Sequence, residues 1–468
     1  MRNFHMSMRF WALCAGWILV RTVAAEEAVS ATLRARVDTT VNSVLERTGV
    51  PSASIALVRD RRIIYAHAYG WAQLEPKRAA APEMRYAIGS ISKEFTATAL
   101  LLLQEEGKVS IDDPAGKWVE GLGPAAHASI RSLLSHTSGI RDFWPQDYDL
   151  PEMAKPVAAK DIVARWASQP PDFPAGTAWQ YSNTGYTVAG MIAERVAGKP
   201  LFEFLSERVF VPLGMKSAFD FDSAPLPAGD AVPYMRYGLG PLRPAAKEAR
   251  GWLFAAGELA MTASDLARWD IAVIEQGVLN AASYRDLTTE VQLRSGVGTG
   301  YALGLDVALD SDRRVLRHNG EVGGFTADNR IYPDDGVAVA VLVNEDATNA
   351  ASLIGDDLIR LMFVDDSPAD AAAVAEARKI FADLQAGRID RARLTANAAS
   401  YFTKQALADF HAGLGPLGKP AAFELKHTGR RGGFVTRNFE VTFPGKKLRV
   451  VVRAQDDGII EQYTVNAE

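Results

Sequence analysis

The chain has 468 residues, 48% of them hydrophobic and 23% charged, and a formal net charge of −5. This composition is typical of a globular protein of two or three domains, and it excludes a disordered or fibrous chain. The weakly acidic balance, without a basic block, argues against nucleic-acid binding, which depends on neutralising phosphates. The one cysteine, Cys14, excludes a disulfide framework and a cysteine-based metal site, and we expect neither a metal nor another cofactor.

The first 25 residues have the pattern of a targeting segment. Arg2 and Arg9 precede the apolar run Phe10–Val20, and Val23–Ala25 offers the small residues of a signal-peptidase site. The run is shorter than the roughly 20 apolar residues that a membrane-spanning helix needs. We therefore interpret residues 1–25 as a cleaved signal, which predicts a secreted or periplasmic protein with no membrane span after cleavage.

The next elements alternate between helix and strand. Apolar residues at helical spacing predict a helix over residues 27–48 and another from Ser90 to Glu106. Between them, Ser52–Val58 and Ile63–Tyr69 are β-rich runs around a polar turn, which predicts a hairpin. From residue 108 to about 250, short helices alternate with loops rich in proline and glycine.

Helix is expected again at Ala263–Gln276, and strands are expected afterwards. These strands are Gly300–Leu309, Arg314–His318 and a hairpin over Asn329–Asn344 that turns at Pro333–Gly336. Early and late strands around a helical middle predict an α/β fold whose sheet joins both ends of this part of the chain.

The pattern changes near residue 365, where a short polar linker begins. Helices are expected at about 370–386 and 403–413, followed by four short strands that end at Val465. We therefore divide the chain into residues 1–25, 26–365 and 366–468, the last being a small α+β domain. Its order of elements is similar to a cystatin- or NTF2-like module, and the sequence names no protein partner for it.

The first motif with a chemical interpretation is Ser90-Ile91-Ser92-Lys93. A serine hydroxyl needs a neighbouring base to become a nucleophile. Residues three apart on a helix lie on one face, so Lys93 can reach Ser90. Desolvation of a lysine lowers its pKa and lets it act as that base. A helix-capping serine followed by a surface lysine would give the same pattern.

Two further motifs become informative in combination with the first. In Tyr181-Ser182-Asn183 the phenol can transfer protons, and the amide can bind a peptide group; alone, it would be an ordinary loop. In His318-Asn319-Gly320, the glycine lets a substrate lie close to a strand backbone. The same His-x-Gly pattern occurs at His411 and at His427, but both of these residues lie beyond the linker.

These three motifs, in this order, resemble those of the serine β-lactamase and D-alanyl-D-alanine carboxypeptidase superfamily, in its class C-like branch. The third motif is His-x-Gly, more like the peptidase and aminopeptidase members than the Lys-Thr-Gly of many class C enzymes. The resemblance covers about residues 30–360 and implies a β-lactamase-like antiparallel sheet flanked by helices, with a mostly helical subdomain. Other stretches that carry it are Leu133–Gly139, Phe173–Gly176, Ala256-Gly257, Thr262–Asp265, Ile331–Pro333 and Val341–Asn344.

The resemblance also implies roles for particular residues. Ser90 would be the acylated nucleophile, with Lys93 and Tyr181 as the proton-transfer pair. Asn183, His318 and Gly320 would bind substrate, and the backbone N–H groups of Ser90 and Glu321 would form the oxyanion hole. The implied activity is a serine hydrolase that forms an acyl-enzyme on amide or ester bonds of a small-molecule or peptide substrate. A lactamase-like esterase and a non-catalytic penicillin-binding sensor are the alternatives.

Four other residues admit two interpretations. His136 lies near serines, which suggests a catalytic triad, but the turn-like Ser135–Gly139 favours a structural role. Trp144, Trp179 and Trp252 could line a substrate pocket or anchor loops and core.

Overall fold

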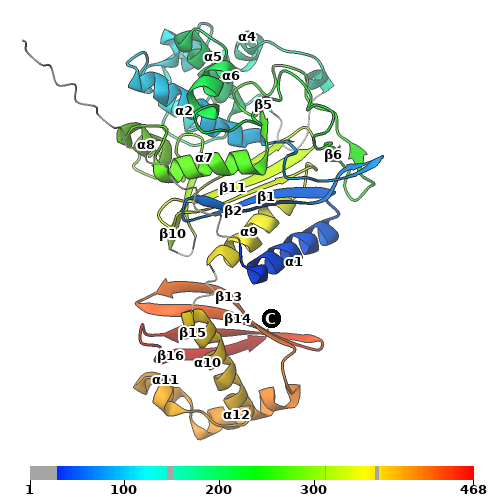
Figure 1. Cartoon of the computed structure of the whole chain (residues 1–468). Coiled ribbons are helices and arrows are strands. Elements are labelled where there is room, and N and C mark those ends of the chain that lie inside the picture. The colour runs from blue at the N-terminus through cyan, green and yellow to red at the C-terminus, as the bar shows by residue number, and fades with distance from the viewer. Residues whose placement is uncertain (1–28, 145–150, 311, 364–367, 468) are drawn as a thin grey trace, which may run out of the picture.

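The computed structural model describes residues 29–144, 151–310, 312–363 and 368–467. The segment that we interpret as a signal therefore lies outside the described residues, as does part of the linker. Four layers follow one another in Figure 1: a helical subdomain, a large sheet, the helices α1 (Ala31–Thr48) and α9 (Ala350–Phe363), and a C-terminal domain. In the part of the chain that the structure describes, no helix is both long and apolar enough to cross a membrane.

The large sheet has seven strands in the order β3-β2-β1-β12-β11-β10-β9, and neighbouring strands are antiparallel. The early hairpin pairs with the late one, because Ala53 of β1 lies opposite Val343 of β12. The expected sheet that joins both ends is confirmed. The strands are β1 (Ser52–Arg59), β2 (Arg62–Leu74), β3 (Lys77–Ala79), β9 (Asp306–Asp310), β10 (Arg313–Val322), β11 (Phe325–Tyr332) and β12 (Val337–Val343).

Helices cover both faces of this sheet, which explains why its central strand is apolar throughout. Every residue of β12 is buried, as expected for a strand with protein on both faces. α1 and α9 pack on one face and share a core with alternate residues of β12, including Val339 and Val341. On the other face lie α7 (Ala263–Glu275) and the helical subdomain, which form the largest core with Ala338, Ala340 and Leu342.

Several expected strand boundaries are wrong: β2 continues beyond Tyr69 to Leu74, and β11 begins at Phe325 rather than Asn329. β9 begins at Asp306 rather than Gly300, because residues 303–305 form a bend. β10 continues through His318 to Val322, so the third motif lies inside a strand rather than after it. The extension is paired with β11 and closes through the two-residue turn Gly323-Gly324, and a glycine in a strand does not end it where a partner strand is present.

The helical subdomain contains short elements, as expected for residues 108–250, together with one longer helix that positions the second motif. That helix is α5 (Asn183–Ala197), and it packs on α2 (Ser92–Glu105). The other elements here are η1 (Gly89–Ile91), η2 (Ala115–Lys117), η3 (Gly123–His127), α3 (Ile130–Leu134), η4 (Pro151–Ala154), α4 (Ala159–Ile162), η5 (Val163–Ala167), α6 (Leu201–Leu205), η6 (Ser206–Phe210) and α8 (Ala281–Thr288). Two small sheets contain β4 (Tyr86–Ala87), β8 (Leu259–Met261) and β5 (Phe219–Asp220), and β6 (Tyr234–Met235) and β7 (Arg243–Pro244).

The C-terminal domain has its own sheet and its own core, which confirms the small α+β domain. Its strands are longer than expected and pair in chain order; the core includes Phe381, Phe439 and Val450. Its likeness to a cystatin- or NTF2-like module remains a prediction. The elements are α10 (Pro368–Gln385), η7 (Arg391–Arg393), α11 (Ala396–Tyr401), α12 (Lys404–Leu414), η8 (Gly415–Leu417), β13 (Ala422–Arg431), β14 (Phe434–Phe443), β15 (Lys446–Ala454) and β16 (Ile460–Ala467).

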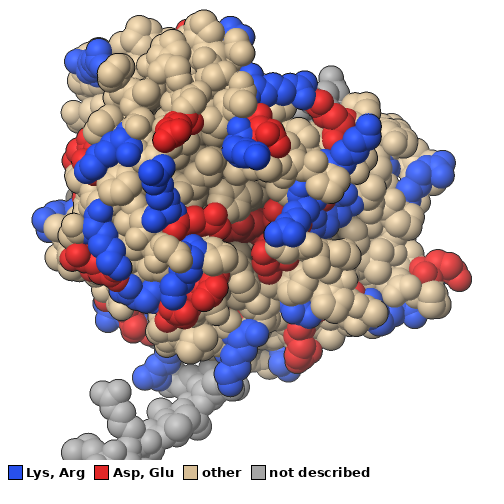
Figure 2. Space-filling view, turned by 90° about the horizontal axis from the view of Figure 1, so that it is seen from above, with Lys and Arg blue, Asp and Glu red and all other residues tan. Residues whose placement is uncertain are grey.

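Charged side chains are mixed on the face seen from above the helical subdomain. Figure 2 shows Lys and Arg side chains next to Asp and Glu side chains over this face, not gathered into one basic patch. Ion pairs of the helical subdomain include Arg165 with Glu152 and Lys199 with Glu207. Exposed pairs of this kind contribute little to stability, at most about 1 kcal/mol each.

Candidate active site

Ser90 lies in a single 3-10 turn, η1, between β4 and α2. The turn is pressed against the backbone of β10. A Cβ atom added to Gly89, whose φ is +51°, would lie 2.6 Å from the amide nitrogen of Glu321. One added to Gly320 would lie 1.9 Å from the carbonyl oxygen of Ile88. Only glycine permits this approach at either position, so the first and third motifs meet through their backbones.

Lys93, in the first turn of α2, is fully buried and directs its amine at Ser90. Its Nζ donates hydrogen bonds to Ser90 Oγ at 2.9 Å, to Asn183 Oδ1 at 2.9 Å and to the carbonyl oxygen of Ala256 at 2.7 Å. Burial lowers the pKa of Lys93 to about 7, and the Asp142 carboxylate offsets part of that shift. Near neutral pH the amine is therefore both protonated and neutral in comparable amounts, as a general base requires.

Tyr181 joins the same hydroxyl from the other side. Its hydroxyl is hydrogen-bonded to the Ser90 side chain, and the Lys93 amine lies 4.9 Å from the centre of its ring. Burial raises the pKa of Tyr181 above its ordinary value, and the bond to Ser90 opposes the rise. At neutral pH the group is thus a phenol that can donate a proton.

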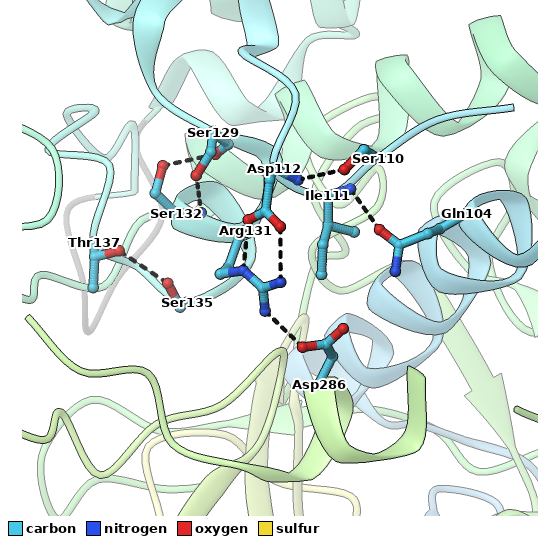
Figure 3. A network of polar contacts seen from close by, with 10 residues as sticks. All are labelled: Gln104, Ser110, Ile111, Asp112, Ser129, Arg131, Ser132, Ser135, Thr137 and Asp286. Carbon is cyan, nitrogen blue, oxygen red and sulfur yellow. Dashed lines mark hydrogen bonds and ion pairs between the residues drawn. The ribbon is translucent and has the colours of Figure 1, made fainter. Parts of the chain in front are cut away.

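His136 supports Tyr181 and forms no hydrogen bond with Ser90 among the described contacts. Its ring centre lies 4.1 Å from that of Tyr181, and its Nδ1 accepts the backbone N–H of Ser182 at 3.1 Å. The residue has a φ of +58°, and the hydroxyls of Ser135 and Thr137 on either side bond to each other at 2.9 Å (Figure 3). These contacts favour the structural interpretation over the catalytic triad.

Asn183 is the first residue of α5, after the helix-capping Ser182, whose hydroxyl accepts the N–H of Gly185 at 3.1 Å. Its side-chain Oδ1 accepts from Lys93, and its Nδ2 donates to Asp142 Oδ2 at 3.1 Å. The expected role was binding of a substrate amide. In this geometry the amide is engaged on both sides within the protein, which leaves one Nδ2–H for a substrate.

His318 is buried, and both of its ring nitrogens have partners within the protein. Nε2 lies 2.8 Å from the hydroxyl of Tyr301, and Nδ1 lies 2.5 Å from the carbonyl oxygen of Asn319. Burial, reinforced by the charge on Lys93, lowers the pKa of His318 to about 3. The imidazole is neutral at physiological pH and forms a wall of the site, so it presents no cation to a substrate.

The backbone of Glu321 faces Ser90, as an oxyanion hole would need. The hairpin β10–β11 closes on the pair Val322 and Phe325, and antiparallel residues alternate in the direction of their hydrogen-bonding groups. The N–H of Glu321, one residue earlier, therefore points away from β11 and toward Gly89. Its carboxylate is directed elsewhere and accepts the N–H of Ala347 at 2.7 Å.

The remaining candidate residues divide into near and distant ones. Trp179 is 41% exposed, and its ring centre is 6.5 Å from that of Tyr181, so it lies at the edge of the site. Trp252 is buried, and half-buried Trp144 packs with the same Phe143. The two other His-x-Gly histidines, His411 and His427, belong to the C-terminal domain, where they lie on α12 and β13.

Two residues that hold the motifs together escaped the sequence analysis. Tyr301 holds His318, and the sequence analysis places it in the expected strand Gly300–Leu309 without a role in the site. Asp142 holds Asn183 and lies three residues after the Leu133–Gly139 stretch. A polar loop residue carries no spacing signal, because its partner is decided by tertiary packing.

A model of one protein family, described as Beta-lactamase, matches residues 33–362. Penicillin-binding protein 4* of Bacillus subtilis (strain 168) is 26% identical over 300 residues, which are 61% of this chain and 66% of that protein. A D-aminopeptidase of Brucella anthropi is 26% identical over 322 residues, which are 66% of this chain and 58% of that protein. The chain thus spans about two thirds or less of the length of these curated relatives.

Solved structures show the same fold. A D-stereospecific amidohydrolase from Streptomyces sp. is 28% identical, with a TM-score of 0.59, over 68% of this chain and 96% of that one. The octameric penicillin-binding protein homologue from Pyrococcus abyssi is 20% identical, with a TM-score of 0.62, over 92% of this chain and 99% of that one. This last likeness shows the fold alone, and its coverage extends into the C-terminal domain.

Proposed function

The chain belongs to the beta-lactamase family, and from that premise we propose that it is a serine hydrolase that cleaves amide or ester bonds through an acyl-enzyme on Ser90. One observation carries the proposal: the Lys93 amine and the Tyr181 hydroxyl both bond to the Ser90 side chain. A weak nucleophile beside one group that can accept a proton and another that can donate one is the arrangement that acyl transfer requires.

The proposed sequence of steps uses these groups in turn. Neutral Lys93 takes the proton of Ser90 Oγ, which attacks the substrate carbonyl carbon. The developing oxyanion accepts hydrogen bonds from the N–H groups of Ser90 and Glu321. Tyr181 then donates its proton to the leaving nitrogen or oxygen as the bond breaks, and the proton on Lys93 replaces it. A water molecule attacks the acyl-enzyme with the same groups in reverse, which releases the acid and restores Ser90.

For the substrate, we propose small amides built on D-amino acids. The D-aminopeptidase and the D-stereospecific amidohydrolase among the similar proteins support this class. The neutral His318 supports it as well. Without a cation at the third motif, a negatively charged antibiotic has no partner there, and we expect slow turnover of β-lactams.

The test of the nucleophile is covalent labelling of the full chain with a fluorophosphonate, followed by peptide mapping. We expect labelling at Ser90 in the wild type and none in Ser90→Ala with an unchanged circular dichroism spectrum. Tyr181→Phe keeps the ring against His136 and should lose about 10²–10⁴-fold in ester turnover. Labelling of another serine in Ser90→Ala would refute the mechanism.

The substrate class is tested by turnover of four compounds: a D-amino-acid amide, its L-enantiomer, a p-nitrophenyl ester and a chromogenic cephalosporin. We expect the D-amide to exceed both the L-amide and the cephalosporin in kcat/KM. Equal rates on the two enantiomers would reject the proposed stereochemistry and leave a general esterase. An acyl adduct that forms and never hydrolyses would identify a penicillin-binding sensor instead.

We also propose that residues 1–25 direct secretion and are then removed. The support is the basic start, the apolar run and the small residues at Val23–Ala25. N-terminal sequencing of the protein recovered from a bacterial periplasm or medium tests it. We expect a new N-terminus at or near Glu26, whereas an intact Met1 in that fraction would contradict cleavage.

A further inference from the structure

The carboxylate of Asp142 is fixed at the N-terminus of α5, behind the groups that contact Ser90. It accepts the backbone N–H of Asn183 at 2.8 Å and the side-chain Nδ2 of the same residue at 3.1 Å. Burial raises the pKa of this carboxyl, while the backbone N–H groups of Asn183, Trp144 and Thr184 and the charge on Lys93 oppose the rise and favour the ionised form. A negative group at the first turn of a helix is stabilised by the unpaired N–H groups there. Four donors thus hold this half-buried side chain in one place.

The pairing with Asp142 decides which way the Asn183 amide points. An ionised carboxylate only accepts hydrogen bonds, so it must face the NH₂ end of the amide. The oxygen end is then directed at Lys93, where it accepts from Nζ at 2.9 Å. The reverse orientation would place the NH₂ group of Asn183 against the Lys93 ammonium, and neither of these two donors would then have an acceptor. Asp142 therefore fixes one of the three acceptors of Lys93.

Asp142 also supplies negative charge to an amine whose other neighbours are neutral near pH 7. From α5, the Tyr186 ring lies 5.3 Å from the amine, and the pKa of its phenol is raised well above its ordinary value. From the loop after α3 and from β10, His136 and His318 have lowered pKa values and are uncharged. Two other acids, Glu94 and Asp306, act on the neighbouring phenol of Tyr301.

We propose that Asp142 is a positioning residue for the reaction: it orients the Asn183 amide toward Lys93 and places a negative charge behind that amide. The inference rests on the proposed function. The contacts run from Asp142 to Asn183, from Asn183 to Lys93 and from Lys93 to Ser90. Asp142 thus acts on Ser90 only through the other two residues. Its effect should therefore show in the pH dependence as well as in the rate.

The experiment is the pH profile of kcat/KM for a p-nitrophenyl ester, from pH 5 to 9, with the full-length wild type and Asp142→Asn. Loss of the negative charge makes the Lys93 ammonium easier to deprotonate. We expect the acidic limb of the profile to move to lower pH by about one unit, the order of magnitude for the loss of one nearby opposite charge. The maximal rate should fall roughly 10–100-fold, because the amide that orients Lys93 is no longer fixed.

Two controls separate charge from shape. Asp142→Glu keeps the charge, so its limb should stay near the wild-type position even if the rate falls. Asp172→Asn removes a carboxylate from a nearby surface pair with Arg141 and Gln180, and should leave both rate and limb unchanged. If Asp142→Asn does not fold, Asp142→Ser removes the charge with a smaller side chain and gives the same readout.

The outcomes also separate this inference from the proposed function. If Ser90 is labelled in the wild type but the limb of the neutral variants does not move, Asp142 does not set the pKa of the base and the inference is wrong. An equal shift of the limb in Asp142→Glu would likewise reject the role of charge. Labelling or turnover that survives Ser90→Ala would instead overturn the proposed function itself.

Discussion

Three oxygen acceptors surround the Lys93 amine, and none of them carries a charge. A serine hydroxyl, an amide oxygen and a backbone carbonyl satisfy its three N–H bonds, but they stabilise the ammonium less than a carboxylate at the same distance would. Burial then favours the neutral form. The Lys93 ammonium is therefore less stable than an ion-paired one, and the amine can act as a base near pH 7.

This arrangement predicts the pH dependence of acylation. Because burial lowers the pKa of Lys93 to about 7, kcat/KM should rise with pH and reach half of its plateau near pH 7. Lys93→Arg keeps a positive charge but cannot deprotonate, so it should lose nearly as much activity as Ser90→Ala, because groups that act as a unit are not additive. Rates of fluorophosphonate labelling from pH 5 to 9 measure both effects. Substantial activity in Lys93→Arg would exclude Lys93 as the base.

Gly320 is important to the site because it has no side chain, which lets β10 lie close to the Ser90 turn. An added Cβ would lie 1.9 Å from the carbonyl oxygen of Ile88 and 3.1 Å from the backbone nitrogen of Ser90, so in Gly320→Ala either β10 or the Ser90 turn must move. We expect a loss of about 1–3 kcal/mol in the free energy of unfolding, as for other overpacked positions, and at least a tenfold loss of ester turnover. Urea denaturation and ester turnover measure the two effects.

The matched control is Gly413→Ala, in α12 of the C-terminal domain, where an added Cβ would meet nothing within 4 Å. That change should leave turnover intact and should not destabilise, since alanine favours a helix over glycine. If Gly320→Ala matched it in both measurements, close approach of β10 to Ser90 would not be what the site requires.

At the scale of elements, the sequence predicts strands and long helices well. The hairpins β1–β2 and β11–β12 follow from β-branched runs around polar turns, and α7 follows from its apolar stripe. The five-residue helix α3 is too short to show a period, so its boundaries could not be predicted. The sequence predicts an end of this strand at His318, because a glycine two residues later is typical of a strand end when the partner strand is unknown.

The candidate site divides in the same way. Ser90, Lys93, Tyr181 and Asn183 could be found because each belongs to a short motif, and the structure brings all four within one hydrogen-bonded group. The engagement of His318 by Tyr301 could not be predicted, since the two residues are 17 positions apart and meet across β9 and β10. Which side chain satisfies a buried polar atom depends on the packing of elements, and no local pattern encodes it.

Helix α2 carries a second buried ionisable group beside Lys93, and it predicts how stability depends on pH. Glu94 Oε2 accepts the indole N–H of Trp269 at 2.6 Å, while Glu94 Oε1, Asp270 Oδ2 and Asn329 Oδ1 have no partner. A proton held on a carboxyl group can act as a donor where water does not reach these oxygens. Burial raises the pKa of Glu94 and the Asp270 charge adds to the rise, while the side chains of Trp269 and Asn329 oppose it; burial also raises the pKa of Asp270.

The sign follows from proton linkage. Above pH 4.5, the ordinary pKa of a glutamate, the unfolded chain releases a proton that folded Glu94 retains, so stability falls as pH rises, by at most about 1.4 kcal/mol per pH unit for each such proton. Glu94→Gln removes one of these protons, and its NH₂ group can donate to a neighbouring oxygen. We expect the free energy of unfolding of Glu94→Gln to fall less between pH 6 and 9 than that of the wild type, as measured by urea denaturation.

Glu105→Gln, an exposed position at the end of the same helix, is the control and should leave the wild-type slope unchanged. A slope in Glu94→Gln that equals the wild-type slope would mean that Glu94 is ionised in the folded protein, and that another group satisfies its free oxygen.

At the scale of the whole molecule, no hydrophobic core of the described residues combines the two parts of the chain. The two cores around the large sheet contain residues up to Phe363, and the core of the C-terminal domain begins at Val374. The two parts meet where α9 and β10 approach β13, in a cavity of about 470 Å³ lined by Phe363, Ile359, His427 and others. The cavity is lined by residues of β9, β10, β11, α9 and β13, whereas Ser90 lies in η1, just before α2.

This separation predicts that a chain of residues 26–365 keeps the catalytic chemistry. Each contact described at Ser90, Lys93 and Tyr181 comes from residues before Ala347, and the strand β12 that completes the sheet ends at Val343. We expect ester turnover within about threefold of the 26–468 form, a difference of less than about 0.7 kcal/mol in the activation free energy. Circular dichroism first establishes that the shorter chain is folded, and kcat/KM on a p-nitrophenyl ester is then compared.

Loss of stability and loss of chemistry would look different in that experiment. Removal of β13 uncovers the side of α9 that carries Ile359 and Phe363, and exposed apolar surface promotes association. The shorter chain should therefore melt at a lower temperature and aggregate more readily while its folded fraction stays active. A folded, monomeric and inactive chain would instead mean that the C-terminal domain supplies part of the active site. His427 would then have to be tested first, because it is the histidine of that domain on the cavity wall shared with α9.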